Sequence, residues 1–121
     1  CRCLSILKYL VSEGVDVNQV DISGRSPVLI ASQKNYSSVV EYLVSHGADV
    51  NQSNNNGRSP LWIASRYGHL SIVKYLESHG ADVNRIDKYG DSPVRIASDY
   101  GHFSIVKYLV SHGADMYLQL G

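Results

Sequence analysis

The chain has 121 residues, of which 44% are hydrophobic and 18% charged, and its 11 Lys and Arg balance 11 Asp and Glu. This length suits one domain, and the zero net charge argues against a general nucleic-acid binder or a polybasic membrane binder, because both carry a basic excess. No apolar run approaches the roughly 18 residues of a membrane span, no secretory leader is recognised, and only Cys1 and Cys3 are cysteines, so we expect an intracellular, cytoplasmic protein without a disulfide framework.

An internal repeat organises the sequence. Ser-Pro pairs begin at residues 26, 59 and 92, and Ser-His-Gly-Ala-Asp runs begin at residues 45, 78 and 111, so both motifs return at the same fixed interval. Residues 1–20 match only the last part of this unit, since Leu4–Val11 aligns with Leu70–Glu77. We therefore predict one domain of residues 1–121, divided into a half repeat (1–20), three repeats (21–53, 54–86 and 87–119) and a tail (120–121).

Each repeat is predicted to contain a turn, a short helix, a tight turn, a second helix and a loop. In the second repeat an Asn-Gly turn precedes Ser59, a good N-cap, and Pro60, which suits the first helical position because its missing N–H costs nothing there. Gly68 then ends the helix in a left-handed cap, and Asn35 takes the same place in the first repeat as the next-best residue at positive φ. The second helix stops before Gly80 and places apolar residues at helical spacing, at Leu70, Ile72, Val73 and Leu76.

Both predicted helices are too short to stand alone. Isolated helices below about 12–15 residues are marginal in water, so these must be held by the apolar faces of neighbouring repeats, as in a solenoid. The sequence therefore predicts an all-α fold built by stacking.

The repeated motifs resemble those of the ankyrin repeat family. The family pattern Thr-Pro-Leu-His-x-Ala has counterparts at residues 26–31, 59–64 and 92–97, and the ending Gly-Ala-Asp-Val-Asn occurs at 47–51 and 80–84. The resemblance covers nearly the whole chain and implies an all-α ankyrin-repeat solenoid of stacked helix-turn-helix units with β-turn fingers. The His of the family pattern is replaced by Leu29, Trp62 and Arg95, so we expect its bond between turn and helix to be missing and the fingers to be looser.

Neither end of the chain carries the polar outer face that a terminal repeat of a solenoid needs. The half repeat has no first helix, and the last repeat is as apolar as the inner ones at Ile105, Val106, Leu109 and Val110. The residues after Asp115 start no new repeat. We therefore expect a segment of a longer array, or, if the chain is complete, self-association through its uncapped ends.

Several side-chain sets suggest chemistry, but their period argues for framework. His46, His79 and His112 recur once per repeat, and helices packed about 8–10 Å apart are too distant for one metal ion, so we predict bonds to helix-end carbonyls. The Ser-His-Asp trio at residues 45–49, 78–82 and 111–115 is repeated, whereas a catalytic triad is built once. Cys1 and Cys3 would supply only two metal ligands. We predict no catalytic residue, no metal and no cofactor.

Two further sets are also interpreted as framework. His69 and His102 follow a helix-ending Gly and are predicted to bond the turn between the two helices. Tyrosines recur once per repeat on the second helices, and we predict that they pack with their hydroxyl groups at the rim, at Tyr9, Tyr42, Tyr75 and Tyr108.

The positions that differ between repeats are the candidates for contact with a partner. The ankyrin resemblance implies docking on the concave face, at the finger tips and the exposed side of the first helices. The matching positions are Ile22, Ser23, Arg25, Gln33, Lys34, Asn55, Asn56, Arg58, Arg66, Tyr67, Lys88, Tyr89, Asp91, Asp99 and Tyr100. Trp62 is added as either a residue packed between fingers or a partner anchor.

The leading hypothesis is a non-catalytic protein-protein interaction module. Arg25, Lys34, Arg58 and Arg66 form a predicted basic patch, with no acid among the candidate positions of the first two repeats, so an extended or acidic peptide would suit this side, with Tyr residues as anchors. The alternatives are a regulatory segment of a larger enzyme or channel, and a self-associating structural solenoid. We expect neither a nucleic acid nor a membrane as partner.

Overall fold

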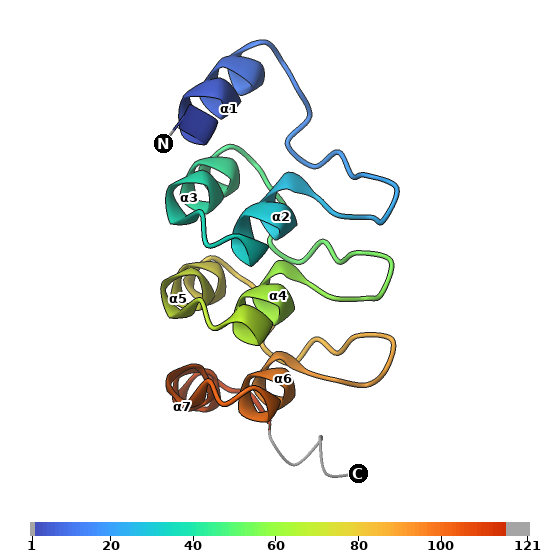
Figure 1. The fold of residues 1–121 in the computed structure, drawn as a ribbon, viewed down its shortest axis with the longest axis vertical. Helices are drawn as coiled ribbons and strands as arrows, with labels where there is room; N and C mark the ends of the chain where they lie inside the picture. Colours follow the sequence, from blue (N-terminus) through green and yellow to red (C-terminus); the bar gives the residue numbers. More distant parts are fainter. Residues whose placement is uncertain (1, 116–121) are drawn as a thin grey trace.

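The computed structural model describes residues 2–115 and consists of helix pairs stacked along one axis (Figure 1). The elements are α1 (Arg2–Ser12), α2 (Pro27–Gln33), α3 (Ser37–Ser45), α4 (Pro60–Tyr67), α5 (Leu70–Ser78), α6 (Pro93–Asp99) and α7 (Phe103–Ser111). The first helices α2, α4 and α6 form one layer, and α1, α3, α5 and α7 form the other. A loop projects from the first-helix layer before α2, α4 and α6, and α1 stands without a first helix. The predicted all-α repeat architecture is confirmed for the described residues.

The first helices begin at the predicted Ser-Pro pairs. The hydroxyl oxygens of Ser26, Ser59 and Ser92 accept hydrogen bonds from the backbone N–H three residues on, at 3.3, 3.1 and 3.2 Å. Each cap is followed by Pro at the start of the helix. Residues close in sequence therefore set where the first helices start.

The turns between helices use the predicted positive-φ residues. Gly68 caps α4 with φ of 78°, and Asn35 has φ of 61° at the matching place after α2. Among the described residues Asn35 is the one residue other than Gly with positive φ. The interpretation of Asn35 as a substitute for Gly is confirmed.

The core lies between the two helix layers and runs through successive repeats. Leu43, Leu61, Leu76, Val94 and Leu109 are fully buried in one continuous cluster. A second cluster on the first helices contains Leu29, Trp62, Ile63 and Ile96. No single helix pair encloses these side chains, so neighbouring repeats stabilise one another, as expected for a solenoid.

An asparagine near the end of each unit connects it to the next. The Asn51 side chain accepts the Asp82 N–H at 2.8 Å and donates to the Gly80 carbonyl at 3.1 Å. The same two bonds run from Asn18 and from Asn84 to the following unit. Asn recurs at this place in the half repeat and in the first two repeats, and this recurrence is the signal in the sequence for a connection between repeats.

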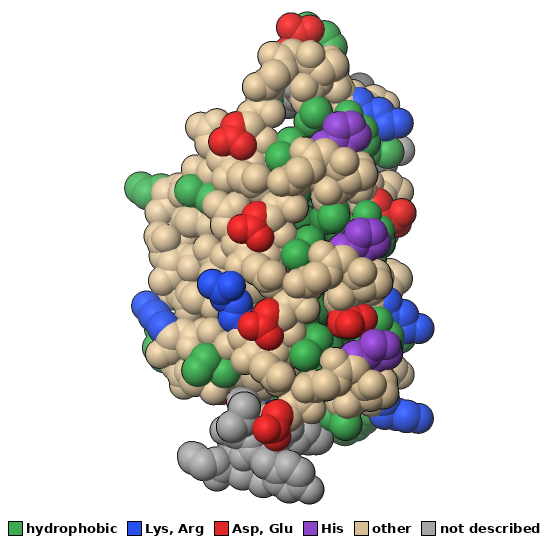
Figure 2. All heavy atoms as spheres, turned by 180° about the vertical axis from the view of Figure 1, so that it is seen from behind, with side chains coloured by type: hydrophobic (Ala, Val, Ile, Leu, Met, Phe, Trp, Pro, Cys, Tyr) green, Lys and Arg blue, Asp and Glu red, His purple; other side chains and the backbone are tan. Residues whose placement is uncertain are grey.

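The histidines at the ends of the second helices have the predicted structural role. Nδ1 of His46, His79 and His112 lies 2.8–2.9 Å from the carbonyl oxygen four residues earlier. Each imidazole stacks on the Tyr to which this carbonyl belongs, with ring centroids 4.0–4.1 Å apart. In Figure 2 histidine side chains recur down one side of the molecule. The packing prediction therefore holds for these three tyrosines, whereas Tyr9 is 64% exposed and does not fit it.

The Tyr108 hydroxyl group connects the last two second helices. It donates to Glu77 Oε1 at 2.7 Å. Burial, followed by the hydrogen bond and the negative charge of Glu77, raises the pKa of Tyr108 to about 12. The pKa in an unfolded chain is about 10. The folded state favours the neutral phenol over the phenolate. The contribution of Tyr108 to the free energy of unfolding is therefore fully present below about pH 10 and is lost as the pH rises through about 12.

A spectroscopic titration tests this pKa. Phenolate absorbance of the folded protein should contain a late component near pH 12, and Tyr108→Phe should remove it. Glu77→Gln should move the component to lower pH without abolishing the shift, because burial is the larger cause. Burial also raises the pKa of Tyr75, so the titration is repeated in a Tyr75→Phe background, where a component near pH 12 that survives Tyr108→Phe would contradict the assignment.

Candidate functional site

The residues predicted to contact a partner form two groups at opposite ends of the first helices. The finger group lies on or beside the three fingers (residues 21–25, 54–58 and 87–91), and contains Ile22, Ser23, Arg25, Asn55, Asn56, Arg58, Lys88, Tyr89 and Asp91. The helix-end group lies where α2, α4 and α6 end, and contains Gln33, Lys34, Arg66, Tyr67, Asp99 and Tyr100. A helix of this length separates the two groups by about 10–12 Å.

Each finger is held by the side chain of its first residue. Asp87 Oδ1 accepts the N–H groups of Tyr89 and Asp91, both at 2.9 Å. Asp21 and Asn54 make the corresponding pairs of bonds in the other fingers. A backbone bond from the first N–H to the fifth carbonyl closes each loop. These side chains hold the turn in the absence of the family His, while the expectation of looser fingers stays a prediction. The recurrence of Asp, Asn and Asp at the first position of each repeat was the overlooked signal.

The fingers are also bonded to one another. The Asn55 N–H donates to the Ser23 carbonyl, and the Lys88 N–H donates to the Asn56 carbonyl, both at 3.0 Å. The Asn55 side chain adds a bond to the Ile22 carbonyl at 3.0 Å. The three fingers therefore form one connected wall beside the first helices.

Two cations of the predicted basic patch are paired with acids. Arg58 Nε lies 3.1 Å from Asp87 Oδ2, whose side chain is fully buried. Arg25 Nε lies 2.8 Å from Asp21 Oδ2, where both side chains are partly exposed. The backbone N–H of Arg25, ahead of the opposing effect of burial, lowers the pKa of Asp21. Asp21 and Asp87, the first residues of two fingers, were not among the candidate positions. Because they pair with Arg25 and Arg58, the predicted basic patch needs correction.

Trp62 is packed in the core and does not form a surface anchor. Only 3% of it is exposed, and its Nε1–H donates to the Asp91 carbonyl at 3.2 Å. The Arg58 guanidinium lies 4.4 Å from the Trp62 ring and 5.6 Å from the Tyr89 ring. Of the two interpretations given to Trp62, packing is supported. Its bond to Asp91 also connects α4 to the next finger.

The helix-end group is centred on Arg66. Its guanidinium carbon lies 3.8 Å from the centroid of the Tyr100 ring and 4.7 Å from that of Tyr67. The ion pairs found among the described residues do not include Arg66. Both Arg58 and Arg66 lie against aromatic rings, but of the two only Arg58 is also paired with a carboxylate among the described residues.

Two histidines hold the helix ends from the following repeat. His69 Nε2 lies 3.0 Å from the Gln33 carbonyl, and His102 Nε2 lies 3.0 Å from the Arg66 carbonyl. A carbonyl only accepts, so each Nε2 carries the proton. The two imidazoles bond the end of a first helix beside the turn between two helices, as predicted, and this turn belongs to the preceding repeat.

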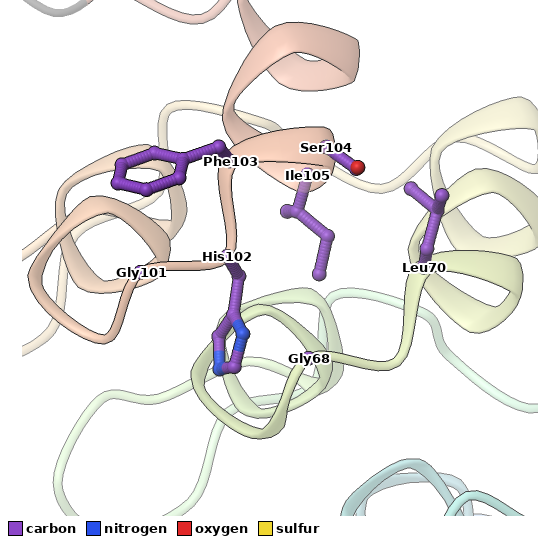
Figure 3. A pocket seen from close by; sticks show the side chains of 7 residues that line it. All are labelled: Gly68, Leu70, Gly101, His102, Phe103, Ser104 and Ile105. Atoms are coloured by element: carbon purple, nitrogen blue, oxygen red, sulfur yellow. The ribbon is translucent and has the colours of Figure 1, made fainter.

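A shallow hollow near these groups lies on the turns between first and second helices. Its volume is about 290 Å³, and Gly68, Leu70, Gly101, His102, Phe103, Ser104 and Ile105 line it (Figure 3). The His102 ring points toward Gly68 in this view. A Cβ atom on Gly68 would lie 2.7 Å from His102 Cε1, so only Gly permits this approach. A second hollow of about 310 Å³ at Asn35–Val39 lies at the matching turn of the first repeat.

The described residues contain no arrangement suited to metal binding. No group of three or more His, Cys, Asp or Glu side chains is placed to hold a metal ion in this part of the chain. Cys1 lies outside the described residues, as does the Cys3 side chain. In the Ser-His-Asp trio of the second repeat, Ser78 donates to the Tyr75 carbonyl at 2.8 Å, and His79 uses the same acceptor. The Ser and His side chains of this trio therefore cap a helix end.

Comparison with known proteins points to one family. A family model described as ankyrin repeats, in 3 copies, matches residues 1–87 and 52–119. No curated protein matches the chain. No helix within residues 2–115 combines the length and apolar character that crossing a membrane requires.

Proposed function

The chain belongs to the ankyrin repeat family, and from this premise we propose that it binds a partner protein or peptide on the face formed by its fingers and first helices. Ankyrin repeats are generally protein-protein interaction modules and typically have no catalytic activity. In this proposal the chain holds its partner by shape, aromatic contact and charge, and changes no covalent bond. An intracellular location is part of the proposal.

One observation carries the choice of face. Ile22, Asn55 and Lys88 occupy the same place on three connected fingers, and all three are exposed. Their side chains are apolar, amide and cationic, although the bonds that hold the fingers repeat almost unchanged. A constant framework that displays different exposed side chains is the arrangement that selective recognition requires.

The finger group and the helix-end group also contain residue types that dominate binding energy. Ile22 is 98% exposed, and Tyr89, Tyr100 and Tyr67 are between 42% and 65% exposed. Tyr is a preferred hot-spot residue because a large ring is buried with little loss of rotamer freedom. An extended segment that crosses the fingers and reaches the helix ends would contact all four side chains.

A matched pair of variants tests the proposal. Peptides that bind the native chain would be selected from a random-peptide library, and their affinities measured by calorimetry. Tyr89→Ala should weaken binding about tenfold, the effect of a typical hot-spot residue. Tyr9→Ala is the control, because Tyr9 is equally exposed but lies on α1 in the other helix layer.

Equal effects of the two substitutions would place binding elsewhere. Association of the chain with itself, without saturable peptide binding, would favour the alternative of a self-associating structural solenoid. Light scattering over a range of concentrations distinguishes this case.

A further inference from the structure

The three arginines of the finger group and the helix-end group are not equivalent. Arg58 and Arg25 each have a carboxylate partner, at 3.1 and 2.8 Å. Among the described residues, the partners found for the Arg66 guanidinium group are the rings of Tyr67 and Tyr100. A ring attracts the positive charge but accepts none of the five guanidinium N–H groups in the way that a carboxylate does. Arg66 therefore keeps the Nε–H donor that Arg58 and Arg25 each use on a carboxylate.

The position of Arg66 is set before any partner arrives. Its carbonyl accepts a hydrogen bond from His102 Nε2, so the last turn of α4 is joined to the next repeat. Tyr100, whose ring is nearest to the guanidinium, lies at the end of α6 two residues before His102. A side chain held in this way loses less rotamer freedom on binding than a free surface Arg.

The charges around Arg66 favour an anion. Lys34, at the end of the preceding first helix, is exposed and adds a second positive charge. Asp99, at the end of the next first helix, is the acid in this group, and its Oδ1 lies 3.2 Å from Arg95 Nε. The negative charge that could compete for Arg66 is therefore engaged within its own helix.

We propose that Arg66, framed by Tyr67 and Tyr100, binds a carboxylate of the partner, and that the partner is an acidic peptide segment with an Asp or Glu side chain at this place. The inference rests on the proposed function and specifies the partner of the same face. The planar guanidinium group can donate two parallel N–H bonds to one carboxylate. One Arg beside one exposed Lys suits a single carboxylate charge, whereas phosphorylated motifs are met by clusters of Arg.

A double-mutant cycle with selected peptides tests the proposal. The tightest peptide from the random-peptide selection would be prepared with each Asp or Glu changed to Asn or Gln. One of these changes should weaken binding to the native chain about tenfold. The same change should weaken binding to the Arg66→Gln variant less than twofold. Arg85→Gln is the matched control, because Arg85 is an exposed Arg outside both groups, and the tenfold difference should persist there.

The outcomes separate this proposal from the proposed function. If peptide binding depends on Tyr89 but no acidic side chain is coupled to Arg66, the carboxylate site is wrong and the binding face stands. If no selected peptide responds to Tyr89→Ala, the binding face is wrong and the carboxylate site with it. A further version of the selected peptide carries phosphoserine in place of the Asp or Glu that is coupled to Arg66. Coupling to Arg66 that arises only with phosphoserine would overturn the proposal in favour of a phosphate ligand.

Discussion

Replacing Arg58 by Glu should lower the free energy of unfolding by about 3 kcal/mol. Asp87 is buried, and Arg58 is the cation that neutralises it, with Nε and Oδ2 3.1 Å apart. The substitution leaves a buried carboxylate without its partner and places a second negative charge beside it. The same Asp87 side chain holds the N–H groups of Tyr89 and Asp91, so the third finger should loosen first. Urea denaturation followed by circular dichroism measures the loss.

Two controls assign this loss to the buried pair. Arg25→Glu breaks the corresponding pair between Arg25 and Asp21, in which both side chains are partly exposed, and should lower the stability much less than Arg58→Glu does. Arg58→Gln also removes the cation, and adding Asp87→Asn to this variant should restore much of the lost stability. The buried negative charge is then absent, and Asn54 shows that Asn can make the same turn bonds. If Arg58→Glu and Arg25→Glu cost the same, the buried pair does not stabilise the finger.

Replacing Gly68 by Ala should cost about 2–3 kcal/mol, and replacing Gly101 by Ala only about 1 kcal/mol. Both glycines have φ of 78°, so both variants carry the same backbone strain. A Cβ on Gly68 would meet the His102 ring at 2.7 Å, while a Cβ on Gly101 meets nothing within 4 Å. The difference between the two variants measures the displacement of His102 from its bond to the Arg66 carbonyl.

A second substitution checks the origin of this difference. In the His102→Ala background, Gly68→Ala should cost about as much as Gly101→Ala, because the imidazole that it would displace is absent. The comparison uses urea denaturation of the four variants. A Gly68→Ala cost that stays unchanged without the imidazole would contradict the argument that His102 requires Gly at this place.

The exposed positions of the proposed binding face could be predicted from the sequence, but the contacts of their side chains could not. The variation at residues 22, 55 and 88 was visible against the repeat, and the structure places all three in the open on the fingers. The assignment of Arg58 to a free basic patch was wrong, because its partner Asp87 lies 29 residues away in the sequence. Residues that distant meet only when one finger is stacked on the next.

The sequence by itself determined the local elements and their repetition. Ser59 and Pro60 start α4, and Gly68 and Asn35 end the helices before them, because capping and positive φ depend on a few neighbouring backbone atoms. The fixed interval between the Ser-Pro pairs then determined that such units stack, since helices this short need each other's apolar faces.

Only the tertiary structure decided which polar groups the stacking uses and which it leaves for a partner. His102 reaches the Arg66 carbonyl across 36 residues, and Arg58 reaches Asp87 across 29. These pairings depend on the offset between neighbouring repeats. Local rules of capping and periodicity do not predict this offset. Within residues 2–115 the same offset places Arg66 beside two tyrosine rings without a carboxylate, whereas Arg58 is paired with the buried Asp87 of the next finger.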